Sequence, residues 1–168
     1  KATKNRDPGD APNYENMVSK SKSLRDYLAE QARDVGFSEA EKQVAAKLIG
    51  NVSARGYLEI DFDQFCRDED LEYELAEGVL DTLQRFDPPG VCARDLSECL
   101  RIQLRERKVQ DPTLFTMVDE HLENLARKNY VQIARSLKIP LTKVIESAAF
   151  LVKLDPAPGS RFADEAVP

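Results

Sequence analysis

The sequence predicts an all-α fold of two small helical bundles. Apolar residues recur at helical spacing through most of the chain, and no segment reads as a convincing strand. Leu, Ala, Glu and Arg, which favour helices, exceed Trp, Thr and Gly. Two Asp-Pro segments rich in proline and glycine interrupt the helical pattern, and each predicts a fixed corner between helices.

The central corner has the sequence Phe-Asp-Pro-Pro-Gly-Val-Cys-Ala-Arg-Asp-Leu over residues 86–96. Pro88 and Pro89 cannot continue a helix, because proline lacks an N–H and clashes with the preceding turn. Asp87 precedes a proline and is therefore pushed out of the α region. Gly90 can adopt a positive φ, which redirects the chain. We expect both neighbouring helices to dock around this corner.

A second corner of the same character contains Asp155, Pro156 and Gly159. It begins 68 positions after Asp87, and at that offset four apolar residues ahead of one corner fall on four ahead of the other. Those residues are Ala76, Leu80, Leu83 and Phe86, which fall on Val144, Ala148, Leu151 and Leu154. The pattern indicates a weak internal repeat of short helix, turn, longer helix and corner. The alternative is that any helix ending in Asp-Pro would look alike.

The first bundle is predicted over residues 23–109, after a disordered linker over 1–22 that has almost no apolar residues. Ser23 is a plausible N-cap for a helix that ends at Gly36. Ser-Glu-Ala-Glu at 38–41 has capping-box form and starts a second helix. Further helices are expected after Asp61, over about 72–86, and from Ala93 to about Lys108.

The second bundle is predicted over residues 110–168. Asp111 followed by Pro112 predicts an N-cap and a proline at the first helical position, and this helix should end near Lys128. Two shorter helices follow over about 131–137 and 141–154. Short connections between amphipathic helices favour antiparallel packing in each bundle.

Residues 133–144 have the apolar spacing of a helix-turn-helix, which leaves a DNA-binding domain as an alternative function. However, Lys138 stands where the turn often has Gly, and the candidate recognition helix has only Lys143 and Lys153 as basic residues. Base readout needs Arg, Asn or Gln facing the groove. The net charge of −6 also opposes a generic nucleic-acid binder. These features favour a packing unit without DNA readout.

The sequence offers no catalytic, cofactor or metal constellation. His121 lies beside an apolar helix face with no nucleophile pattern near it in the sequence, so a structural histidine is the better interpretation. Cys66, Cys92 and Cys99 are scattered, which favours buried, reduced thiols over a disulfide framework or a zinc site. The acidic run over residues 61–77 lacks the spacing of a calcium loop. We therefore expect no enzyme and no cofactor.

Length and hydropathy indicate one or two compact domains without a membrane span. The chain has 168 residues, and no apolar run approaches the roughly 18 residues of a spanning helix. No signal peptide is visible, so a cytoplasmic location is expected. Because it starts with Lys and stops soon after a proline corner, the sequence looks like a fragment of a longer protein.

A basic stripe is predicted on the helix from Ala93 to Lys108. It comprises Arg94, Arg101, Arg105 and Lys108, which at 100° per residue fall within about 60° of one another. They oppose the apolar side of that helix, and Glu98 can pair with Arg94 and Arg101. The stripe is either an ordinary solvated face or a docking strip for an acidic partner.

Three segments together resemble the core-binding region of sigma-54, the nitrogen-type bacterial sigma factor. They are Gly56-Tyr57-Leu58, the central corner continued to Leu100, and Leu154 to Phe162, in the family's order. The resemblance runs from about Leu24 to Phe162. It implies docking onto core RNA polymerase for transcription initiation that also requires an activator ATPase. It further implies that promoter DNA is read mainly by a later domain, which has its own helix-turn-helix and is absent here.

Overall fold

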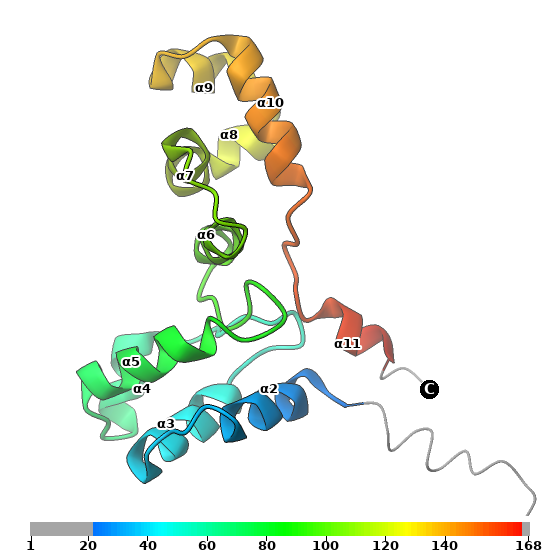
Figure 1. The fold of residues 1–168 in the computed structure, drawn as a ribbon. Coiled ribbons are helices and arrows are strands. Elements are labelled where there is room, and N and C mark those ends of the chain that lie inside the picture. Colours follow the sequence, from blue (N-terminus) through cyan, green and yellow to red (C-terminus); the bar gives the residue numbers. More distant parts are fainter. Residues whose placement is uncertain (1–21, 166–168) are drawn as a thin grey trace, which may run out of the picture.

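The computed structural model describes residues 22–165, and within them it confirms an all-α architecture without strands (Figure 1). Two isolated bridges, Val52 with Leu58 and Tyr57 with Ala93, are the extended pairings found there. Residues 1–21 of the predicted linker lie outside the described residues. No helix of the described chain is both long and apolar enough to cross a membrane.

The first lobe consists of α2 (Leu24–Arg33), α3 (Glu39–Ile49), α4 (Phe62–Asp68) and α5 (Tyr73–Leu83). The predicted caps are present. Ser23 Oγ accepts from the Asp26 N–H at 3.1 Å, and Ser38 and Glu41 form the capping box. Leu28, Leu48, Leu80 and Leu83 lie in its core, so burial of one apolar stripe per helix holds the lobe together.

The second lobe consists of α6 (Leu96–Glu106), α7 (Pro112–Glu120), α8 (Leu122–Ala126), α9 (Tyr130–Leu137) and α10 (Leu141–Val152). Its core includes Leu104 from α6, together with Met117, Ile133 and Val144. Helix α6 also packs on α7. The two apolar clusters therefore divide near Asp95, ahead of α6, and not near residue 110 where the sequence-based division lies.

Two predicted helices have different ends in the structure. Asp95 is the N-cap of α6 and accepts from the Glu98 N–H at 2.8 Å, so α6 begins three residues after Ala93. It ends at Glu106, because Arg107 is its C-cap and Lys108 has φ +59°. The helix predicted from Pro112 to Lys128 is broken at His121, which separates α7 from α8.

The end of the chain returns to the first lobe. Helix α11 (Ser160–Glu165) lies near α2 in Figure 1 and was not predicted. Phe162 stacks on Tyr27 with ring centroids 5.5 Å apart, and Arg161 lies 3.4 Å from the carboxylate of Asp87. The second lobe is thus tied to the first both through the central corner and through residues 153–162.

The eight residues aligned by the 68-residue offset are all buried. They are Ala76, Leu80, Leu83, Phe86, Val144, Ala148, Leu151 and Leu154. The turns ahead of α5 and α10 also correspond. Asp70 has φ +51° and Lys138 has φ +56°, and each is followed by a residue whose N–H closes the turn. These shared features favour the internal repeat.

Candidate functional site

The three segments that carry the family resemblance meet in space between the lobes. The Cys92 N–H donates to the Gly56 carbonyl at 2.8 Å, and the Gly159 N–H donates to the Arg55 carbonyl at 2.9 Å. We call this meeting point the joint, and define it by residues 55–58, 86–99, 103 and 154–159. The recognisable motifs therefore hold the fold together.

Tyr57 connects the first and third segments of the joint. Its hydroxyl donates to the Pro156 carbonyl at 2.6 Å, and its ring is buried beneath the Arg55 guanidinium, 5.4 Å from the ring centroid. Burial, followed by the hydrogen bond with Cys99, raises the pKa of the Tyr57 phenol well above its usual range. The phenol therefore stays protonated and remains a donor.

Two glycines of the joint permit close approach of other groups. Gly90 has φ +93°, which confirms the predicted positive φ, and an added Cβ would lie 2.8 Å from both Cys99 Sγ and Gln103 Nε2. A Cβ on Gly159 would lie 2.5 Å from the Ala54 carbonyl oxygen. Both corners therefore require glycine, Gly90 for its conformation and for space, and Gly159 for space.

A glutamine side chain holds each corner. Gln103 Nε2 donates to the Asp155 carbonyl at 2.7 Å, and Gln103 Oε1 accepts from the Asp155 N–H at 2.8 Å. Gln31 does the same for Asp87, at 2.7 and 2.9 Å. Sequence reasoning missed the roles of both glutamines. The available signal was an amide on an otherwise apolar face, because such a group needs buried partners.

The three cysteines are buried free thiols, as expected. Burial raises the pKa of Cys92 to about 12, and it also raises the pKa of Cys66 and Cys99. Cys99 Sγ lies 3.7 Å from the Asp155 carbonyl in the joint. Among the described residues, no group of three or more His, Cys, Asp or Glu side chains is arranged to hold a metal ion.

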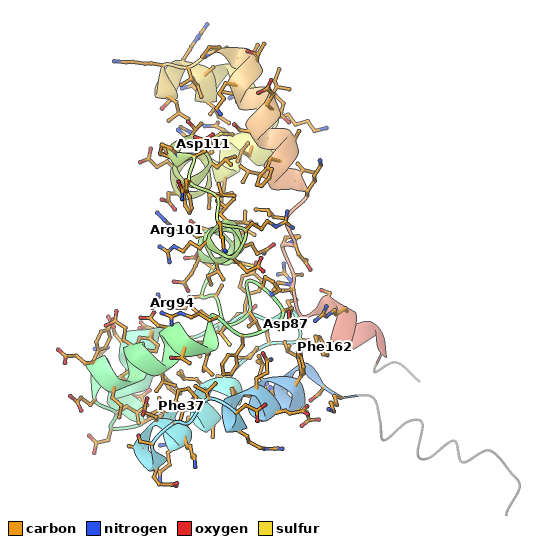
Figure 2. The ribbon with its side chains drawn as sticks, in the orientation of Figure 1. Phe37, Asp87, Arg94, Arg101, Asp111 and Phe162 are labelled. Atoms are coloured by element: carbon orange, nitrogen blue, oxygen red, sulfur yellow. The ribbon has the colours of Figure 1, made fainter. Side chains whose placement is uncertain are left out.

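Arg94 lies ahead of α6 (Figure 2), and Lys108 lies beyond its end, so the prediction that all four basic residues lie on one helix is wrong at these two residues. Its Nε and Nη2 donate to Glu98 at 3.0 and 2.6 Å, and its guanidinium lies over the Phe62 ring. Burial alone would raise the pKa of Glu98, but the hydrogen bonds from Arg94 and Gln84 outweigh burial and lower it. Arg94 thus ties α6 to the first lobe.

Arg101 is also engaged within the molecule. Its Nε and Nη2 donate to the two carboxylate oxygens of Asp119 at 3.0 and 2.7 Å. The guanidinium also lies over the Phe115 ring, 5.2 Å from its centroid. These contacts attach α6 to α7, which leaves Arg101 less available to a partner than the sequence suggested.

Arg105 and Lys108 are exposed, and neither forms an ion pair among the described residues. Arg105 lies near the end of α6, whereas Lys108 lies beyond that end. A cleft of about 500 Å³ is lined by Arg105, and its other charged lining residues are Asp81, Arg85, Asp87 and Glu106. Of the predicted basic stripe, Arg105 and Lys108 remain accessible.

The helix-turn-helix-like pair is formed by α9 and α10, with Lys138 in the left-handed conformation at the turn. Lys143, one of the two basic residues of the candidate recognition helix, donates to Asp111 at 2.7 Å. His121 is buried between α7 and α8, and its Nδ1 lies 3.5 Å from Asn124. Neither observation supports DNA readout or catalysis.

Comparison with known proteins assigns the chain to a family on which the family model and the individual relatives agree. Residues 13–168 match the family described as sigma-54 factor, core binding domain. The chain is 37% identical over 150 residues to RNA polymerase sigma-54 factor 2 of Bradyrhizobium diazoefficiens, covering 89% of this chain and 28% of that protein.

Two further relatives agree. The chain is 36% identical to the RNA polymerase sigma-54 factor of Rhizobium meliloti, covering 92% of this chain and 30% of that protein. It is 31% identical to the factor of Pseudomonas putida, covering 88% and 31%. The chain spans about a third of the length of the curated relatives it matches. The chain belongs to the sigma-54 factor core-binding domain family.

Proposed function

We propose that this chain attaches a sigma-54-type factor to core RNA polymerase. The observation that carries the proposal is the family match over residues 13–168. The structure is compatible with a binding module, because its buried polar groups serve the joint between the lobes. We propose that the chain itself has no catalytic activity.

The proposed contact uses the accessible part of the basic stripe. Arg105 and Lys108 would face acidic groups of the polymerase, while Arg94 and Arg101 hold α6 in place through Glu98 and Asp119. Exposed cations at an interface mainly steer association, so the contact should show as a salt-dependent rate. In the full-length factor, we propose cytoplasmic action with an activator ATPase, and promoter reading mainly by a later domain.

The test is equilibrium and kinetic binding of fluorescently labelled chain to purified core polymerase at two salt concentrations. The charge-reversed variant Arg105→Glu/Lys108→Glu should associate more slowly and lose part of its salt dependence. The matched control is Arg127→Glu/Lys128→Glu, which makes the same charge change at the end of α8, where Lys128 has φ +57°. The control should bind as the wild type does.

A DNA-binding role is the second candidate function, and one binding measurement distinguishes it from polymerase binding. The labelled chain is titrated with promoter duplex near physiological salt. We expect weak or absent binding, since the net charge is −6 and Lys143 is engaged by Asp111. Sub-micromolar affinity for the duplex without affinity for core polymerase would reverse the two candidates.

A further inference from the structure

Helix α10 has a wider apolar surface than its own lobe covers. At 100° per residue, the apolar residues from Leu151 round to Ala149 extend over about 160° of the helix. A surface helix of a globular protein needs an apolar stripe of about 100°. Val144, Ala148 and Leu151 are buried against the lobe, so the rest of the arc needs another explanation.

The uncovered part of this arc is a continuous strip along α10. It comprises Leu141, Ile145, Ala149 and Val152, which we call the α10 outer face. Leu141 is 42% exposed, Ile145 is 47% exposed and Val152 is 81% exposed. Helix α10 packs mainly on α9 and α7, and in Figure 1 one long side of α10 meets no other element of the described chain.

The chemistry of the α10 outer face suits a protein partner. In a DNA-binding helix-turn-helix the second helix presents Arg, Asn or Gln to the base edges. Here the outer face presents only aliphatic side chains. Large aliphatic side chains gathered on one exposed strip mark an interaction site in a soluble protein. A partner that covers them must itself present an apolar surface.

The charges around α10 indicate the sign of that partner's polar residues. From Arg135 to Lys153 the sequence has four basic residues and one acidic residue, although the whole chain has a net charge of −6. Lys143 is engaged by Asp111. Arg135, Lys138 and Lys153 are exposed and form no ion pair among the described residues. Acidic residues at the partner's edges would complement them.

We propose that the α10 outer face binds an amphipathic helix of core RNA polymerase whose apolar side is flanked by Asp and Glu. The proposal rests on the proposed function and adds a second contact, distinct from Arg105 and Lys108. A helix fits because a strip about three turns long matches apolar residues at i, i+3, i+4 and i+7 of a partner helix. The aliphatic residues provide the buried area, and the flanking cations set the orientation.

The test compares single substitutions of exposed aliphatic residues for binding to core polymerase. Ile145→Glu and Val152→Glu each place a charge in the proposed contact and should weaken the affinity by about tenfold or more. The matched control is Val35→Glu, because Val35 is a 40% exposed aliphatic residue of the first lobe. The control should keep the wild-type affinity, and all three variants should keep the wild-type melting temperature.

Other outcomes would overturn the proposal in separable ways. If Ile145→Glu and Val152→Glu bind like the wild type while Arg105→Glu/Lys108→Glu binds weakly, the proposed function stands and the α10 contact is rejected. If the wild type does not bind core polymerase at all, both fail. Sedimentation that shows a wild-type dimer converted to a monomer by Ile145→Glu would assign the face to a second copy of the chain.

Discussion

Gln103 holds Asp155 through both polar atoms of its side-chain amide, one donating to the Asp155 carbonyl and one accepting from the Asp155 N–H. The residue is 3% exposed, and its amide nitrogen would lie only 2.8 Å from a Cβ on Gly90. One buried side chain therefore fixes the second corner to α6 and fills the space beside the first corner. Gln103 and Asp155 therefore form the centre of the joint.

Replacing Gln103 by methionine should destabilise the protein by about 2 kcal/mol. Methionine has a similar volume but leaves the Asp155 N–H and carbonyl without their partners, and orphaned polar groups cost more than the hydrogen bonds contribute. Urea denaturation measures the change. The matched control is Gln31→Met at the more exposed first corner, which should cost less. Equal effects at the two sites would contradict the importance of burial at the joint.

Gly90→Ala should destabilise the protein by about 1 kcal/mol or more, because its φ is +93° and the new Cβ would meet Cys99 Sγ at 2.8 Å. Gly78→Ala is the matched control, since Gly78 lies within α5 with nothing within 4 Å of an added Cβ. That control should stabilise the protein by about 0.5–1 kcal/mol. Thermal melting of both variants tests these two predictions. Equal melting temperatures of Gly90→Ala and Gly78→Ala would mean that the corner tolerates a side chain.

Stability should fall at alkaline pH, in part through Cys92. Burial raises its folded-state pKa from 9.0 to about 12, so its contribution is complete below pH 9 and is lost as the pH rises to 12. The slope for this group is at most about 1.4 kcal/mol per pH unit. The stability of the wild type relative to Cys92→Ala, measured by urea denaturation, should therefore fall from pH 9 to pH 11. Parallel curves would mean that Cys92 titrates normally in the folded protein.

Acid should weaken the attachment of α6 through Glu98. Its folded-state pKa lies below 4.5, because the hydrogen bonds from Arg94 and Gln84 outweigh the opposing effect of burial. The stabilisation is therefore present above about pH 4.5 and is lost as the pH falls through the lower, folded-state value. The stability advantage of the wild type over Glu98→Gln should shrink from pH 5 to pH 3. An advantage that stays constant over this range would reject the Arg94–Glu98 interaction as a source of acid sensitivity.

Much of the fold could be predicted because its signals are local. Ser23, Ser38, Asp61 and Asp111 cap the helices that they were expected to cap, through side-chain hydrogen bonds to backbone N–H groups two or three residues later. Proline and the positive φ of Gly90 also act within a few residues. Helix α11 was missed because its docking depends on Phe162 reaching Tyr27, a contact that no local pattern indicates.

The candidate site was harder to predict, because charge spacing along one helix reveals only partners on that helix. It indicated the pairing of Arg94 with Glu98, which is observed, but not the engagement of Arg101 by Asp119. The Asp119 partner lies on a different helix, so spacing along α6 could not expose it. The α10 outer face was hidden for a similar reason, since a helix with a wide apolar arc reads from sequence as well buried.

The claim that the joint fixes the two lobes relative to each other is tested most directly by measuring the distance between the lobes in solution. Spin labels attached to Glu39→Cys and Glu123→Cys report this distance by pulsed electron paramagnetic resonance. The two sites can be labelled selectively, because both side chains are exposed whereas the three native cysteines are buried. Because Gln103, Tyr57 and the close contacts at Gly90 and Gly159 form one joint, the wild type should give a single narrow distance distribution. This distribution should not change when core polymerase is added. Several distances or a broad distribution in the free wild type would show that the lobes move independently and would contradict the rigid joint.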